Sequence, residues 1–264
     1  MRSTIKRFAR NRPWSPHLSV ENFSSASENI FNALKKFQKT KDLLKKNYHT
    51  NKTLNIMWNE LDSALRDNSF ILSINNSTYT VPVHLSDALD MSYMFLQITV
   101  GKPEYGIHIV EHDIKELLQN KQWFISGLNH ELKHCMEYII SKYKIISRKG
   151  PPDIELLLNK IPPGVLLREH YPEISLREYV GYINMFSELR ANIAQIIHEI
   201  QNKKIDKSSL ISSSDYISLI NSVLKSTLLA THKMPLRIQQ NLISLFTKEN
   251  QKKIIWEVYK ALND

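Results

Sequence analysis

Cysteine is almost absent from this sequence, because Cys135 is the only one among 264 residues. A single cysteine cannot form an intramolecular disulfide, which excludes a disulfide-rich secreted scaffold and favours a reducing compartment. Long apolar runs are absent too, since no stretch reaches the roughly 18 apolar residues of a membrane-spanning helix. The basic N-terminus is not followed by the apolar region of a signal peptide. We therefore expect a cytoplasmic protein without a membrane span.

Three common catalytic motifs are also missing. Glycine is scarce, at 6 residues, and none belongs to a G-x-x-x-x-G-K-[ST] loop. The chain has neither the G-x-S-x-G motif of serine hydrolases nor the C-x-x-C motif of redox proteins. The sequence therefore gives no sign of P-loop nucleotide chemistry, of a serine nucleophile elbow or of dithiol redox chemistry.

The composition is that of a globular protein with excess positive charge. Hydrophobic residues make up 42% of the chain, which is ample for one large domain or one domain with appendages. The formal net charge of +9 predicts weak attraction to polyanions such as nucleic acid. Five of the first 12 residues are Arg or Lys, so we interpret residues 1–26 as a basic arm. Such an arm is either a solvated tail or a contact for nucleic acid or another polyanion.

Hydrophobic periodicity predicts both helices and strands. Apolar residues recur at helical spacing in seven segments: 27–48, 53–66, 123–144, 176–201, 209–227, 234–246 and 248–262. Period-two or β-rich patterns predict strands in three segments: the hairpin 70–85, 94–100 and 105–110.

Three local signals refine this outline. Pro82 places the second run of the hairpin toward a sheet edge, because proline cannot donate to a ladder. Asp113 is expected to cap a helix. The proline-rich segment 148–164 indicates a surface excursion around one helical turn. We predict an α+β fold, mostly helical, with a small mixed or antiparallel sheet and a helical C-terminal third. The expected divisions are the arm 1–26, a main domain 27–201 and a helical subdomain 202–264.

Within the predicted helix 123–144, the chain contains His130, Glu131 and His134 in the order H-E-x-x-H. Residues four apart on a helix differ by about 40° in direction and about 6 Å along the axis, so both imidazoles can chelate one ion. Glu131 is turned by roughly 100° from His130, beside the open coordination position of such an ion. The pattern predicts a catalytic Zn²⁺ site with Glu131 as general base. A solvated helix face with two incidental histidines is the alternative.

A catalytic zinc site needs a third protein ligand and leaves its fourth position to water. In the segment SELRANIAQ, Glu188 is the candidate for the third ligand, and Asn192 follows one helical turn later. We expect Asn192 to hydrogen-bond a metal-bound histidine from outside the ligand set. A surface role for Glu188 is the alternative, and His198 is a more distant candidate ligand.

Three residues near Glu188 in sequence are candidates to stabilise the oxyanion of a peptide-hydrolysis intermediate: Tyr182, Tyr179 and His170. Each of them also fits a packing or surface role. Cys135 follows His134 on a different helix face, and we expect it to be a small core residue rather than a ligand or nucleophile.

A second histidine pair offers a competing interpretation. His108 and His112 frame the inverted order H-x-x-E-H. However, the residues around His108 favour a strand, in which the two histidines would be about 13 Å apart, too far to share an ion. We therefore favour the H-E-x-x-H site.

HELKH followed by the segment E-L-R-A-N-I-A, residues 188–194, resembles the gluzincin branch of zinc metallopeptidases. More narrowly, the second segment is similar to the E-x-x-A-N-x-x-A helix of ImmA/IrrE-type peptidases of phages and bacteria. The resemblance covers about residues 94–201. It implies a zincin-like fold in which the strand 105–110 is the sheet edge along which a peptide lies extended. It also implies three zinc ligands and one base: His130, His134 and Glu188, with Glu131.

The sequence thus predicts a zinc metallopeptidase that acts on a protein or peptide substrate. The alternative is a catalytically silent protein of the same fold, with a structural or interaction role in a phage particle or a nucleic-acid-associated assembly. In that case the protein would be virion-associated, with the basic arm as its anchor.

Overall fold

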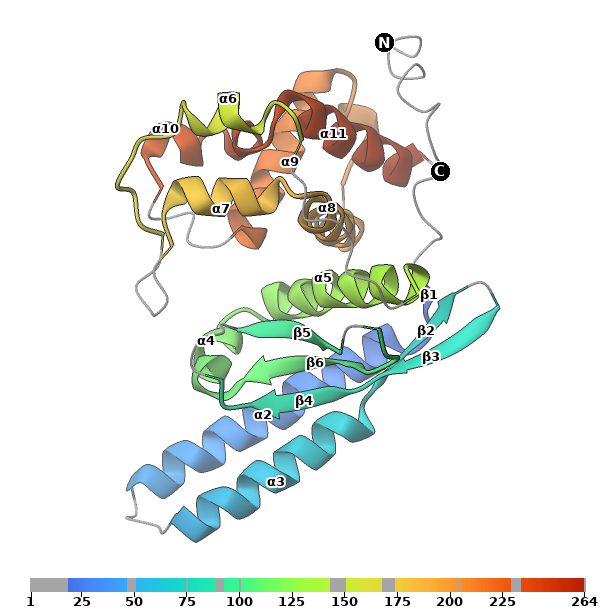
Figure 1. Cartoon of the computed structure of the whole chain (residues 1–264), viewed down its shortest axis with the longest axis vertical. Helices are drawn as coiled ribbons and strands as arrows, with labels where there is room; N and C mark the ends of the chain where they lie inside the picture. Colours follow the sequence, from blue (N-terminus) through green and yellow to red (C-terminus); the bar gives the residue numbers. More distant parts are fainter. Residues whose placement is uncertain are drawn as a thin grey trace.

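The computed structural model describes nine stretches of the chain: residues 19–46, 51–74, 76–88, 93–99, 101–142, 151–167, 174–203, 205–228 and 234–263. Its fold is α+β and mostly helical, as predicted, with two small sheets (Figure 1). Most of the basic arm and His170 lie outside the described residues.

The described part of the chain begins earlier than the expected end of the arm. Strand β1 (Ser19–Val20) pairs with β2 (Phe70–Ile74), and helix α2 (Phe23–Lys46) follows directly. The arm therefore cannot extend to residue 26. Helix α3 (Asn51–Asp67) packs antiparallel to α2 through apolar residues at helical spacing, as the periodicity predicted (Figure 1).

The predicted hairpin is present, but its second run divides between two sheets. Strand β3 (Ser77–Val81) pairs with β2 in the antiparallel order β1-β2-β3. After Pro82, β4 (Val83–Ser86) joins a second, mixed sheet of order β4-β6-β5. Both β3 and β4 are edge strands, as expected from the missing N–H of Pro82.

The expectation that residues 105–110 form a sheet edge is wrong. Strand β6 (Tyr105–Val110) lies between β4, to which it is parallel, and β5 (Met94–Ile98), to which it is antiparallel. Ile107, Ile109 and Val110 are all fully buried, the pattern of a strand covered on both faces. The edge next to helix α5 (Lys121–Ile140) is therefore β5 (Figure 1).

Helix α5 has a clear N-terminal cap and a clear C-terminal end. The side chain of Asn120 accepts a hydrogen bond from the N–H of Trp123, and Lys142, with a φ of 55°, marks the end of the helical segment. Before it come a turn (Glu111–Asp113) and the short helix α4 (Ile114–Leu117). Asp113 precedes α4 but does not cap it, because its carboxylate accepts from the N–H of Tyr93 instead.

The single long helix expected over residues 176–201 is two helices. Helix α7 (Leu176–Ile183) ends at Asn184, Met185 adopts an extended backbone, and α8 (Phe186–Gln201) begins. The fully buried Asn184 side chain explains the break. Its side-chain amide donates to the carbonyls of Val180 and Leu245. Its side-chain oxygen accepts from the Thr247 N–H and the Asn250 amide, which are more than sixty residues later in the chain.

Asn184→Ala should lower the free energy of unfolding by about 2 to 4 kcal/mol, because several buried polar groups lose their partner together. Denaturant unfolding followed by circular dichroism measures this loss. Asn29→Ala is the control, since Asn29 makes an exposed hydrogen bond with Asn68 and its loss should stay within about 0.5 kcal/mol. Equal losses in the two variants would contradict the role assigned to Asn184.

The C-terminal third is helical, as predicted. Its elements are α9 (Ser213–Thr227), the short α10 (Leu236–Gln239), a turn (Leu242–Leu245) and α11 (Lys248–Asn263). The predicted helix 234–246 is thus shorter than expected. The proline-rich excursion carries the short helix α6 (Ile154–Leu158), and a further turn (Lys207–Ser209) precedes α9.

Two hydrophobic clusters make up the core. One combines the sheets with α2 to α5, and the other combines α7 to α11 with residues near α6. The boundary between them therefore lies after α5 rather than after residue 201. Helices α5 and α8 pack together where the two clusters meet (Figure 1). Among the described helices, none is both long and apolar enough to cross a membrane.

Candidate metal centre

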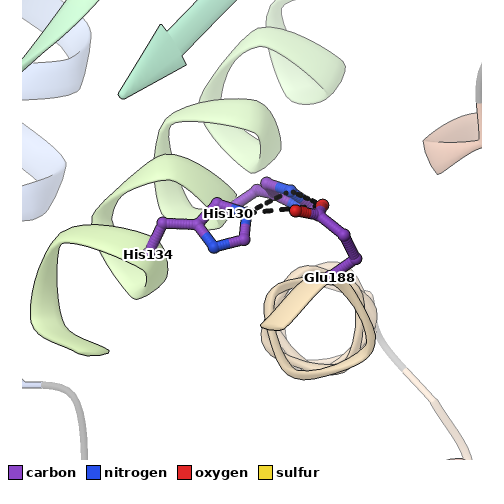
Figure 2. A group of neighbouring side chains, drawn as sticks. All are labelled: His130, His134 and Glu188. Carbon is purple, nitrogen blue, oxygen red and sulfur yellow. Dashed lines mark hydrogen bonds and ion pairs between the residues drawn. The ribbon is translucent and has the colours of Figure 1, made fainter. Parts of the chain in front are cut away.

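The junction of α5 and α8 brings together the three residues that the sequence singled out as ligands. His130 and His134 project from successive turns of α5, and Glu188 projects from the first turn of α8 toward both (Figure 2). The break at Asn184 matters here because it starts α8 two residues before Glu188. The site is thus supported by both hydrophobic clusters.

The three ligand atoms form a nearly equilateral triangle. The distance between the Nε2 atoms of His130 and His134 is 3.1 Å. Glu188 Oε2 lies 3.5 Å from the first and 3.4 Å from the second. Ligand atoms about 2.1 Å from a tetrahedrally coordinated ion would be about 3.4 Å apart. The triangle therefore has the size of one face of such a coordination shell.

The chemistry of this group fits a metal ion as well. Glu188 is 8% exposed, and its Oε2 lies at ion-pair distance from both histidine nitrogens but makes no hydrogen bond among the described residues. Two imidazole nitrogens and one carboxylate oxygen converge on one point, a donor set that binds divalent transition metals. No fourth His, Cys, Asp or Glu joins the group in the described part of the chain. These residues could therefore hold a metal ion and leave one position open.

In the absence of a metal ion, Glu188 forms ion pairs with His130 and His134. Burial alone lowers the pKa of His134, but the carboxylates of Glu188, Glu131 and Glu137 more than offset this and raise that pKa to about 9. Burial raises the pKa of Glu188, and the two histidines reverse this and hold it well below its usual range. A cation is thus favoured at this point, whether it is a proton or a metal ion.

Glu131 lies beside the triangle and outside the ligand group. Burial raises its pKa, and the adjacent His130 and His134 act in the opposite direction. One carboxylate oxygen, Oε2, accepts a hydrogen bond of 2.9 Å from the N–H of Leu96 in β5. This N–H points to the free side of the edge strand, so the strand and the candidate base are in direct contact.

Asn192 is close to the site but makes a different hydrogen bond from the one expected. Its Nδ2 donates to the backbone carbonyl of Glu188 at 2.8 Å, one turn earlier in α8. The interaction shown is therefore with the turn that carries Glu188, and not with a histidine.

Two of the three candidate oxyanion donors line the pocket beside the site: Tyr179 and Tyr182. Although Tyr182 is 47% exposed as a whole residue, desolvation of its hydroxyl and the negative charges of Glu188 and Glu131 raise the pKa of Tyr182 well above 10. Tyr182 therefore keeps its proton and can donate it in a hydrogen bond. The third candidate, His170, is outside the described residues.

An ion pair that the sequence analysis missed also joins the two helices. Arg190 Nη1 of α8 lies 3.3 Å from Glu137 Oε1 of α5. Arg190 follows Glu188 by two residues, and Glu137 follows His134 by three. The only signal in the sequence was a glutamate inside the apolar run of α5, whose partner sequence alone cannot identify.

Comparison with known proteins adds no relative. No family model matches the chain. No curated protein and no solved structure matches it either.

The competing histidines lie elsewhere. His108 stacks between His84 and Phe95 on the second sheet, and His112 Nε2 is 3.7 Å from Asp113 Oδ1. Neither joins a metal-binding group of described residues. His198 packs edge-on against Phe23. Cys135 is fully buried in the core, as expected, and burial raises the pKa of its thiol.

Proposed function

We propose that this protein is a zinc-dependent metallopeptidase. The observation that carries the proposal is the triangle of His130 Nε2, His134 Nε2 and Glu188 Oε2, with the carboxylate of Glu131 beside it and outside the ligand group. Two histidines and one glutamate with one open position are the ligand set of catalytic zinc sites, whereas structural zinc sites are closed by four protein ligands. The similarity of HELKH and residues 188–194 to gluzincins agrees with this ligand set.

The proposed mechanism assigns proton transfer to Glu131. A zinc ion bound by the triangle would acidify a water molecule and polarise the scissile carbonyl. Glu131 takes the proton of the attacking water and then delivers it to the leaving amine. The hydroxyl of Tyr182, close to Glu188 and Glu131, is the best placed of the candidates to donate a hydrogen bond to the oxyanion.

The substrate class follows from the edge strand. An extended peptide can add to the free side of β5 through backbone hydrogen bonds. The N–H of Leu96 is the group on this side that already reaches the site, through Glu131. A peptide carbonyl that takes over this N–H would release the carboxylate for catalysis. A protein or peptide is therefore the proposed substrate. Contact of the basic arm with nucleic acid or another polyanion, and cytoplasmic localisation, stay predictions.

Removal of the metal should abolish hydrolysis reversibly. Purified protein is treated with a chelator, dialysed, and assayed on a mixture of unfolded proteins before and after one equivalent of Zn²⁺ is added. We expect activity to disappear with the metal and to return with zinc, because the polarised carbonyl and the acidified water both depend on the ion. Hydrolysis that survives complete metal removal would contradict the proposal. Bound zinc without hydrolysis of any substrate would favour the structural alternative.

A further inference from the structure

A cavity of about 180 Å³ opens beside the candidate metal centre and is continuous with it, because His130 and Glu131 belong to its lining. His134 and Glu188 do not line it, whereas Trp123 and Gly127, earlier in α5, do. The cavity therefore extends from His130 toward the beginning of α5. A cavity of about 150 Å³ with apolar walls is known to bind one benzene molecule, so this one has room for a single large side chain.

The walls are mainly apolar and aromatic. They come from six elements, β5, α4, α5, α7, α8 and α9 with their adjoining residues, and include Tyr93, Met94, Leu117, Trp123, Tyr179 and Ile183. Tyr93 and Trp123 already meet edge to face, with ring centroids 5.0 Å apart. Aromatic rings in such a setting favour another ring in offset or edge-on contact.

The lining residues also disfavour a charged substrate side chain. Apart from His130 and Glu131, no Asp, Glu, Lys, Arg or His of the described residues lines the cavity. Away from these two residues, a charged side chain that entered would lose its water without gaining a counterion. The neutral polar residues Asn192, Gln195 and Thr227 also line the cavity, and the Oγ1 of Thr227 is buried without a hydrogen-bond partner among the described residues. A neutral side chain with a hydroxyl could use it.

Gly127 keeps the cavity open on the side of α5. Glycine is unfavourable inside a helix, so its presence here indicates a steric constraint. A Cβ atom at Gly127 would lie 3.2 Å from the Sδ and 3.3 Å from the Cε of Met94. A Cβ atom alone therefore requires a small shift of the end of Met94, and a side chain as large as leucine would extend into the cavity.

We infer that this pocket selects one large, uncharged and preferably aromatic side chain of the substrate, next to the bond that is cut. The inference rests on the proposed peptidase function, because only a peptidase would bind this side chain as part of a substrate. The pocket itself is defined by the residues above and can be tested without hydrolysis.

The first experiment measures specificity. Zinc-loaded protein is assayed on blocked pentapeptides of alanine in which the central residue is Phe, Tyr, Leu, Glu or Lys. We expect cleavage beside Phe or Tyr with kcat/KM about 10- to 100-fold above that for Glu or Lys, the range that one well-fitted side chain supplies. Gly127→Leu should remove this preference. Gly181→Leu is the matched control, because Gly181 is also helical and a Cβ there meets no atom within 4 Å. Equal cleavage beside charged and aromatic residues would overturn the inference.

The second experiment needs no activity. N-acetyl-phenylalanine amide is titrated into protein carrying ¹³C-methyl methionine, and the Met94 methyl signal is followed by NMR. We expect a saturable shift that N-acetyl-glutamate amide does not produce and that Gly127→Leu abolishes. If Gly127→Leu does not fold, Gly127→Ala should weaken the binding, since only the end of Met94 must move.

The NMR shift and the hydrolysis assay distinguish failure of the aromatic pocket from failure of the peptidase proposal. A Met94 shift without hydrolysis of any peptide would reject the peptidase proposal and keep the aromatic pocket. Absence of a shift in folded wild-type protein would reject the pocket, even if hydrolysis is observed.

Discussion

Glu131→Gln should lower peptide hydrolysis by roughly 10²- to 10⁴-fold, the usual loss when a general base is removed. Glutamine has the size of glutamate and cannot take a proton from water. It keeps one acceptor oxygen for the N–H of Leu96, so the contact between α5 and β5 can persist. Because Glu131 is outside the ligand group, zinc content should stay at about one ion per chain.

The measurement combines kcat/KM on the best peptide with metal analysis of the same samples. Glu155→Gln is the control, since Glu155 is exposed on α6 and should leave both quantities unchanged. Equal hydrolysis by wild type and Glu131→Gln would refute the assigned base. Loss of zinc in Glu131→Gln would show instead that Glu131 is a ligand.

The double change His130→Ala/His134→Ala should remove the metal. Only Glu188 would remain of the triangle, so zinc affinity should fall by far more than the about 10- to 100-fold that loss of an outer-shell partner costs. Thermal unfolding offers a second readout. A ligand at 100 times its Kd stabilises the folded state by about 2.7 kcal/mol, so zinc should raise the Tm of wild type and leave that of the double variant unchanged.

Glu188→Gln tests the third ligand separately. The amide cannot neutralise the ion, and it removes the carboxylate that holds the pKa of His134 high. We expect weaker zinc binding than in wild type and tighter binding than in the double variant. His108→Ala/His112→Ala is the matched histidine control and should keep its zinc. Loss of zinc in this control, with retention in His130→Ala/His134→Ala, would show that the metal binds at the inverted motif of His108 and His112.

Local patterns in the sequence were enough to identify the candidate ligands. The spacing of His130 and His134 places them on one helix face regardless of what surrounds the helix. Glu188 could be chosen because it stands in a second helical segment with a recognisable neighbour, Asn192. The α+β class followed from the change between helical and strand periods along the chain.

Partners from distant parts of the chain could not be predicted in this way. Asn184 breaks the expected long helix because its side chain bonds a loop more than sixty residues later. Neither the apolar period of residues 176–201 nor helix propensity carries this information. The same limit applies to Arg190 and Glu137, whose pairing exists only because α8 packs on α5.

The sequence by itself identified the residues that could bind a metal ion and the carboxylate that we propose as base, because both choices depend on side-chain chemistry and helix geometry. Only the tertiary structure decided which strand borders the site. Residues 94–98 and 105–110 both have the pattern of a strand, and strand order depends on which segments pair. It also decided the shape of the pocket at Gly127, since six separate elements form its walls. Contacts between elements distant in sequence are set by packing, which local periodicity does not encode.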